Sequence, residues 1–396
     1  MPQRKNTIRQ PAEEKQTEDA RSKKNVPLPE SLKKSKDTPS VFSLSNLSSA
    51  IFKISLTEKL FFIEHLKVLV KAGLSISDSL STLAEQTENK KFKKILIEIK
   101  NGIEKGDTLA KNLAKFPHTF PKIFVSMTEA GEISGTLEEN LNQLSLQMKK
   151  EHTLRVRIRS ALTYPVVVLI ATAGIVTVLL TYVVPRIVSV FAEMEADLPL
   201  PTKILITVDN FILENAIITI LGIIIAVTCF IFAIRTSVGK KILHKIFLSA
   251  PILGPVVKKV NLARFSRTLS SLLKTDIPVV QSFETTADVL MNVYYKKIVT
   301  DAAEKLKKGS LISESLEGNK KLFPPIVTQM INTGEKSGNL DELLEELAVF
   351  YEEQVDETVK GLSSTIEPLL ILFLGVVVGG IALAIIAPMY SLSEQI

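Results

Sequence analysis

The chain has 396 residues, of which 46% are hydrophobic and 23% are charged, with a formal net charge of +6. This length has room for two small domains and for membrane segments, and such a composition requires apolar and charged residues to be kept apart. The single cysteine, Cys229, excludes an internal disulfide framework and a cysteine-based zinc site. Much of the positive charge flanks apolar runs, so we expect no direct contact with nucleic acid.

Residues 1–54 are rich in Lys, Ser, Pro, Gln and Glu and contain few aromatic side chains. Such a segment buries too little apolar surface to offset the entropy lost on ordering, so it predicts a disordered basic tail. It contains no apolar run of the kind found in a cleavable signal peptide. Its lysines are candidates for contact with anionic lipid or an acidic partner, and a merely solvated tail is the alternative.

From residue 55 to 160, apolar side chains recur at helical spacing, as in Leu60, Ile63 and Leu66, and glycines and prolines separate the segments. No alternation typical of β-strands occurs. The pattern predicts a first lobe of about six short helices. Residues 258–365 repeat this pattern and predict a second lobe of the same kind, so the expected fold class is an all-α membrane protein with two homologous helical-bundle lobes.

Three uncharged runs, 160–185, 215–234 and 368–393, are long enough to cross a hydrocarbon core, which requires roughly 20 residues. They predict three transmembrane helices. The resulting divisions are a basic tail (1–54), a first lobe (55–160), a transmembrane helix (161–185), an external loop (186–212), a second transmembrane helix (213–234), a connector (235–257), a second lobe (258–365), a third transmembrane helix (366–389) and an external tail (390–396).

Charged residues next to these runs predict the orientation of the chain. Arg155, Arg157 and Arg159 precede the first run, and Arg235 and Lys240 follow the second, whereas the loop between them is acidic. The positive-inside rule therefore places both lobes and the N-terminus in the cytoplasm, and the loop and the C-terminal tail outside.

The second half of the chain repeats the first, displaced by 203 residues without a gap. The recurring residues are Phe120, Pro121, Gly131, Glu132, Ser134, Gly135 and Leu137 in the first copy and Phe323, Pro324, Gly334, Glu335, Ser337, Gly338 and Leu340 in the second. The same displacement pairs Pro165 with Pro368 and Pro185 with Pro388, which we interpret as helix-end or kink positions near the span ends. The duplicated unit was therefore a helical lobe joined to a span.

The sequence contains no recognisable catalytic motif. The Gly-Glu-x-Ser-Gly element lacks the lysine of a phosphate-binding loop, and we predict a tight connection in which Ser134, Gly135, Ser337 and Gly338 open the next helix. The four histidines are far apart and lack metal-ligand spacing. We therefore expect no enzyme activity, no cofactor and no catalytic or metal-binding residue.

One helix of the second lobe carries a strongly acidic face, which we predict to be a partner surface. The candidate residues are Glu342, Glu345, Glu346, Glu353 and Asp356. A solvated face and a divalent-ion site are the alternatives. Glu367 stands at the mouth of the third span where the first has Tyr164, and it is either functional or an ordinary interfacial carboxylate.

Further residues at the first span resemble a known family. The stretch Arg157-Ile158-x2-Ala161-Leu162-x-Tyr164-Pro165, continuing to Val183-Val184-Pro185, resembles the signature of the type II secretion F / PilC platform proteins, as do Glu367-Pro368 and both Gly-Glu-x-Ser-Gly elements. The resemblance covers about residues 55–390, and the basic tail is its one departure.

The resemblance implies a multi-pass protein of the bacterial inner membrane that serves as a platform in a type IV pilus or type II secretion machine. It implies contact with a cytoplasmic ATPase, pilin or pseudopilin subunits, other inner-membrane assembly proteins, the lipid bilayer and further copies of the chain. A transporter or channel and a proton-driven force transducer are alternatives from other classes. Both would favour polar or charged residues at mid-membrane, whereas besides apolar residues the span interiors hold only Thr, Ser, Gly and Tyr.

Overall fold

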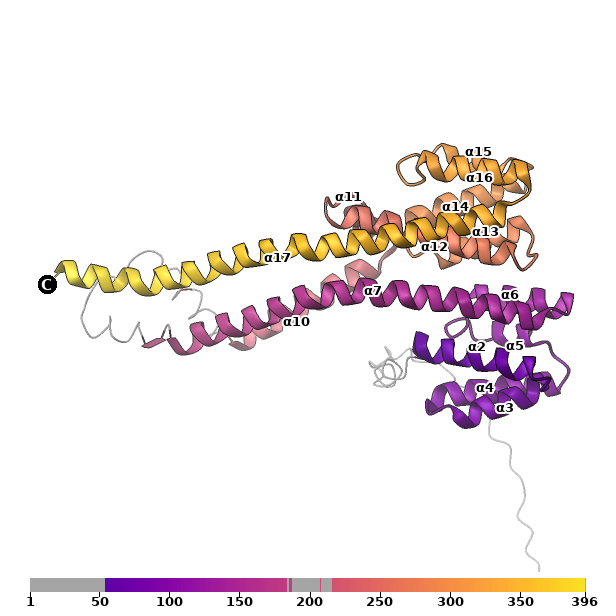
Figure 1. Ribbon diagram of the computed structural model, residues 1–396. Helices are drawn as coiled ribbons and strands as arrows, with labels where there is room; N and C mark the ends of the chain where they lie inside the picture. Colours follow the sequence, from indigo (N-terminus) through magenta and orange to yellow (C-terminus); the bar gives the residue numbers. More distant parts are fainter. Residues whose placement is uncertain (1–53, 184, 187–206, 208–215, 396) are drawn as a thin grey trace, which may run out of the picture. The chain divides into compact units, whose positions relative to one another are not determined.

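The computed structural model describes residues 54–183, 185–186, 207 and 216–395. The predicted tail and almost all of the predicted external loop lie outside these residues. All of the described helices belong to one compact unit, residues 52–396 (Figure 1). The described residues contain helices and no strand, which confirms the predicted all-α class.

The first lobe contains five short helices and the start of a long one. They are α2 (Leu56–Lys71), α3 (Ile76–Gln86), α4 (Lys90–Glu104), α5 (Leu109–Ala114), α6 (Lys122–Ser134) and α7 (Leu137–Val178). Polar side chains begin several of them, as when the Glu58 N–H donates to Ser55 Oγ at 3.1 Å. The buried rings of Phe62, Phe92 and Phe120 contact one another at the centre of the lobe core.

The second lobe has the same order of helices. They are α12 (Leu253–Leu273), α13 (Val279–Val289), α14 (Val293–Leu306), α15 (Ile312–Glu317), α16 (Pro325–Ser337) and α17 (Leu340–Gln395). The helices α13, α15 and α16 begin and end 203 residues after α3, α5 and α6, so the repeat in the sequence is a repeat of structure. The second core is built around Phe265, Phe283, Tyr295 and Phe323.

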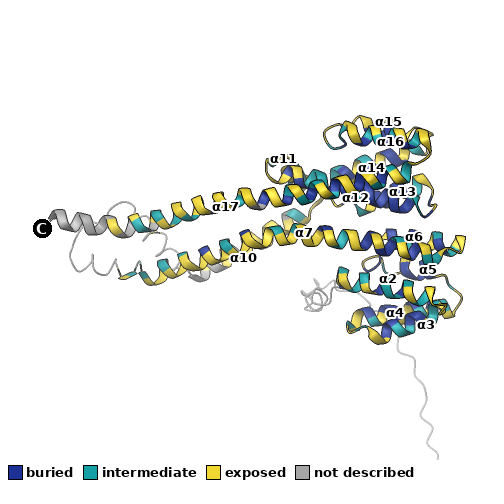
Figure 2. Ribbon diagram, viewed as in Figure 1, coloured by how far each residue is buried: buried dark blue, intermediate teal, exposed yellow. Residues whose placement is uncertain are grey.

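The last helix of each lobe continues as an apolar segment. Two described stretches, Leu137–Val183 and Leu340–Gly380, are long and apolar enough to cross a membrane. Figure 2 shows that α7 and α17 carry many exposed residues away from the lobes, where the sequence is apolar. Lipid is the environment in which such surfaces are stable.

The predicted second span coincides with α10 (Ala216–Arg235), a 20-residue helix in which only Arg235 is charged. After it come α11 (Ser237–Ser249) and α12, which are bent by 106° from each other. Together these two would form another apolar stretch, but α12 is largely buried in the second lobe. The number of crossings and the side of the N-terminus remain predictions.

Three of the four predicted helix-end or kink prolines lie inside long helices. Pro165 lies inside α7, and Pro368 and Pro388 lie inside α17, so none of these three ends its helix. Pro185 follows a π-helical turn, Leu179–Val183, that extends α7. Because proline removes a helix hydrogen bond, a widened turn beside it is a common local adjustment.

Candidate functional site

The Gly-Glu-x-Ser-Gly element joins two helices at the same point of each lobe. Gly135 and Gly338 end α6 and α16 with φ values of 72° and 80°, which favour glycine. A Cβ on Gly131 would lie 2.9 Å from Leu137 Cα, and one on Gly334 would lie 2.8 Å from Leu340 Cα. The element is therefore a tight turn that brings consecutive helices into backbone contact.

The glutamate of the element caps another helix. Glu132 Oε1 accepts from the Leu109 N–H at 2.6 Å, and Oε2 accepts from the Ala110 N–H at 2.9 Å. In the second lobe Glu335 accepts from the Ile312 and Ser313 N–H groups at 2.5 and 3.0 Å. A carboxylate at the start of the six-residue helices α5 and α15 satisfies free amides and complements the helix dipole.

The prediction that Ser134 and Ser337 open the following helices is wrong, because they are the last residues of α6 and α16. Ser134 Oγ instead donates to the Ala130 carbonyl at 2.7 Å. The remaining residues of the element have structural positions within each lobe. Phe120 and Phe323 are buried, and Pro121 and Pro324 precede the first residues of α6 and α16. Leu137 and Leu340 begin α7 and α17.

The two lobes meet where α7 packs against α12 and α17. Gln147 Nε2 donates to Thr268 Oγ1 at 3.1 Å, and Ser271 Oγ donates to Gln147 Oε1 at 3.1 Å, all buried. Beside them, Arg264 binds both oxygens of Glu151, with Nε at 3.0 Å and Nη2 at 2.8 Å. We call these five residues the lobe junction.

An apolar cluster continues the lobe junction towards the apolar stretches of α7 and α17. Its buried members come from α7, α12 and α17 and are Leu154, Val256, Val260, Val355 and Val359. Leu272 and Ile277 of the second lobe also join the core of the first. The two lobes are thus packed into one body and not merely tethered.

The acidic face of α17 divides into two parts. Glu345 contacts Arg267 at 3.2 Å and also Lys274, and Asp356 contacts Arg157 at 3.5 Å and Lys360 at 2.8 Å. These two carboxylates therefore hold α17 to α12 and α7, which sequence spacing did not indicate.

Glu342, Glu346 and Glu353 form the other part, and all three are exposed. Within the part of the chain that the structure describes, no cation forms an ion pair with any of them. We call these three residues the acidic stripe. The residues that the structure describes contain no cluster of His, Cys, Asp and Glu suited to a metal ion.

The face of α12 in the lobe junction has a counterpart on α2 that is exposed. The positions 203 residues before Arg264, Thr268 and Ser271 hold Phe61, His65 and Val68. Phe61 and Val68 are 46% and 57% exposed, and the Phe61 and His65 rings stack with centroids 3.7 Å apart. The first lobe therefore presents an apolar face where the second lobe presents a polar, occupied one.

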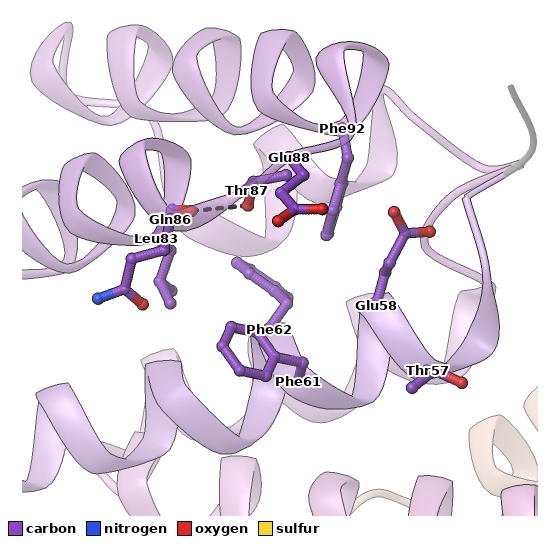
Figure 3. Close-up of a pocket in the computed structure, with 9 residues that line it drawn as sticks. All are labelled: Thr57, Glu58, Phe61, Phe62, Leu83, Gln86, Thr87, Glu88 and Phe92. Carbon is purple, nitrogen blue, oxygen red and sulfur yellow. Dashed lines mark hydrogen bonds between the residues drawn. The ribbon is translucent and has the colours of Figure 1, made fainter.

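A cavity of about 260 Å³ lies beside this face (Figure 3). Phe61, Phe62 and Phe92 line it together with the carboxylates of Glu58 and Glu88. Burial raises the pKa of Glu58, but hydrogen bonds from Ser55 and Asn89 outweigh it and leave the pKa below its ordinary value. Because Glu58 caps α2 and the lining residues include no nucleophile paired with a base, the cavity carries no catalytic assignment.

Tyr164 and Glu367 lie exposed on α7 and α17, near the start of the apolar stretches. Neither forms part of the lobe junction, and no role of theirs follows from the geometry.

Sequence patterns do not indicate the capping role of Glu132 and Glu335, because each carboxylate bonds a helix about 23 residues away. The recurrence of this glutamate at matched positions of both lobes is the sequence feature that points to such a role.

The family model for "Type II secretion system (T2SS), protein F" matches this chain twice, at residues 62–185 and 265–388. The type IV pilus assembly protein PilC of Myxococcus xanthus is 34% identical over 337 residues, covering 85% of this chain and 81% of that protein. PilC of Thermus thermophilus is 36% identical over 335 residues, covering 84% and 81%. The type II secretion system protein F of Aeromonas hydrophila is 31% identical over 342 residues, covering 86% and 88%.

Proposed function

The chain belongs to the type II secretion system protein F family, and from this premise we propose that it is the inner-membrane platform of a type IV pilus or type II secretion machine. In this role it couples a cytoplasmic ATPase to the assembly of pilin-like subunits into a filament. The observation that supports the proposal best is the continuity of each lobe with an apolar helix. Both α7 and α17 begin in a lobe core and continue as membrane-length helices.

A continuous helix is a suitable element for transmitting displacement, because successive backbone hydrogen bonds resist its extension. The lobe junction links α7 to α12, and Arg267 links α12 to Glu352 of α17 at 2.7 Å. A load applied to one lobe therefore reaches both long helices. The assembly of filament subunits needs such a body between a motor on one side and subunits in the membrane.

The acidic stripe is the surface that we propose for the motor. Its three carboxylates are exposed, while their neighbours Glu345 and Asp356 are engaged inside the chain. These carboxylates would orient a basic surface of the partner, since complementary charge sets the encounter rate and the register of a complex. Contacts of this kind weaken with salt, because screening acts over about 8 Å at physiological ionic strength.

Charge reversal of the stripe tests this surface. The variant Glu342→Lys, Glu346→Lys, Glu353→Lys should lose filament assembly, measured by electron microscopy, while the protein stays in the membrane at normal levels. The matched control Glu85→Lys, Glu98→Lys, Glu314→Lys changes three other exposed glutamates and should assemble filaments normally. Normal filaments in the stripe variant, or loss of that protein from the membrane, would contradict the proposal.

Further copies of the chain are a second proposed partner, and the repeat supports a site for their contact. In the lobe junction Gln147 contacts Thr268 and Ser271. The positions equivalent to these are Phe350 on one side and His65 and Val68 on the other, and Phe350 is 43% exposed. A copy of the junction formed between two chains would bury Phe350 of one against Val68 of the next.

Cysteine cross-linking tests this contact, because Cys229 is the only native cysteine. In a Cys229→Ser background, Val68→Cys with Phe350→Cys should give a disulfide-linked dimer in membranes. The control pair Val68→Cys with Ile133→Cys should not, although Ile133 is 82% exposed. Equal dimer from both pairs would show random collision and would remove the proposed interface.

A transporter or channel would be a different function for a protein with apolar helices. Purified chain in liposomes should pass no ions or small solutes if it acts as a platform. Measurable flux above that of empty liposomes would favour the transport function.

A further inference from the structure

Helix α11 lies between α10 and the second lobe and has two unlike faces. On one face His244 Nδ1 accepts from the Val293 N–H at 3.1 Å, and Leu248 packs against the core of the lobe. On the opposite face Val238, Ile242 and Ile246 follow one another at four-residue spacing. They are 64%, 56% and 56% exposed. An aliphatic row of this kind is unfavourable in water.

The position of α11 in the chain indicates what covers this row. It begins two residues after Arg235, the last residue of the apolar helix α10, with Thr236 as its N-cap. The side chains of α10 are themselves widely exposed and apolar, as with Ile218, Phe230 and Phe232. If α10 crosses the bilayer, α11 starts at the edge of the hydrocarbon, where amphipathic helices lie in the interface plane.

Lysines accompany the aliphatic row. Lys241 and Lys245 lie along one edge of it, and Lys245 also lines a cavity of about 590 Å³ that reaches α12, α14 and the connection from α15 to α16. The cavity lining contains three more lysines, Lys258, Lys320 and Lys321, and one carboxylate, Glu317. Among the described residues, none of these lysines has a carboxylate in ion-pair contact.

We propose that α11 lies in the cytoplasmic surface of the bilayer, with Val238, Ile242 and Ile246 among the acyl chains, and that the lysine-lined cavity takes the headgroup of an anionic phospholipid. Positive charge and an apolar row on one helix match the two ends of such a lipid. The inference rests on the inner-membrane location in the proposed function and on α10 as the predicted second span, and it does not depend on contact with a motor.

The depth of α11 can be measured directly, because the chain has no tryptophan. Full-length protein carrying Ile242→Trp is reconstituted in vesicles of phosphatidylcholine and phosphatidylglycerol with brominated acyl chains. We expect strong quenching of its fluorescence and little quenching for the control Leu311→Trp. Leu311 lies on the second lobe, and its side chain is 47% exposed. Equally weak quenching of both variants would overturn the interfacial position, including the case in which protein covers the row.

Headgroup selectivity is tested with bromine on one lipid at a time. Quenching of Ile242→Trp should be stronger with brominated phosphatidylglycerol than with brominated phosphatidylcholine at equal total composition. Adding Lys245→Gln, Lys258→Gln, Lys320→Gln and Lys321→Gln should bring the two quenching values close to equality, since each lysine near an anionic surface strengthens association by about fivefold. The control Lys90→Gln, Lys91→Gln, Lys94→Gln, Lys105→Gln removes four exposed lysines of the first lobe and should retain the preference. An unchanged preference in the cavity variant would overturn the headgroup site, while filament assembly would report separately on the platform role.

Discussion

Gly131 and Gly334 are matched residues at which each lobe depends on the absence of a side chain. Each faces the backbone of the next helix, at Leu137 and Leu340, and backbone cannot move aside as a flexible side chain can. The glutamate that follows each glycine then reaches back to cap α5 or α15. One short motif thus fixes three helices relative to one another.

Substitution Gly131→Ala should therefore destabilise the protein by about 1–3 kcal/mol, the usual cost of overpacking a close contact. Gly334→Ala should behave in the same way because the geometry repeats. The control is Gly361→Ala in α17, where an added Cβ meets nothing within 4 Å and the substitution should stabilise slightly. Thermal unfolding of the full chain in detergent measures all three, and an equal effect at residues 131 and 361 would contradict the close-contact account.

At this scale the sequence predicted a tight connection but not its details. Serine often begins helices, which predicts that Ser134 opens the next one, whereas the left-handed Gly135 makes Ser134 the last residue of α6. Glu132 could not be assigned because its partners at residues 109 and 110 become neighbours only through folding. Local patterns determine turns, and contacts across a lobe require the packed structure.

Among the helices, α11 is attached to the second lobe through a titratable side chain, His244. Partial burial and the nearby Lys240 lower the pKa of His244 from its ordinary value. The neutral ring is the form that accepts from Val293 N–H, and Tyr294 Oη donates to the Lys241 carbonyl beside it at 3.4 Å. The attachment of α11 therefore depends on an uncharged imidazole.

As pH falls through the ordinary histidine value of about 6.5, the detached state binds a proton before the attached state does, so attachment weakens. Amide hydrogen exchange in α11, corrected for intrinsic rates, should rise between pH 7.5 and 5.5. In His244→Leu the rise should be absent, because no group remains to titrate there. A rise of equal size in both proteins would exclude His244 as its cause.

The prediction of about six helices per lobe agrees with the structure when the lobe part of the long last helix is counted with the five before it. The acidic helix shows where pattern alone fails. Glu345 and Glu346 are neighbours in sequence, yet Arg267, 78 residues before Glu345, engages only the first. Which carboxylates remain available for a partner followed from the packing of α12 and not from the spacing on α17.

For the whole molecule, duplication has produced two similar lobes with different faces. The α12 face contacts α7 through Arg264, Thr268 and Ser271, while the matching α2 face holds Phe61, His65 and Val68. Two lobes from one ancestor thus form an asymmetric pair within a chain. The face of α2, which has no partner of this kind among the described residues, therefore remains exposed for contact with other proteins.

The orientation of this pair is tested by reporter fusions. Fusions after residues 150 and 320 should both report the cytoplasm, and a fusion near residue 196 should report the exterior, because Arg and Lys clusters flank the lobe side of the apolar runs. A fusion after residue 235 should again report the cytoplasm. Signals from opposite sides for the two lobes would remove α10 as a span.

The claim that this chain passes motor work to a filament is tested most directly by the identity of the protein that touches α17 during assembly. A photo-crosslinking amino acid at Glu346 should form an adduct with the cytoplasmic ATPase in living, filament-forming cells, detected by mass on an immunoblot. The same amino acid at Glu314, which is also exposed, should not. An ATPase adduct at Glu314 alone, or adducts at neither position while filaments continue to assemble, would contradict the account.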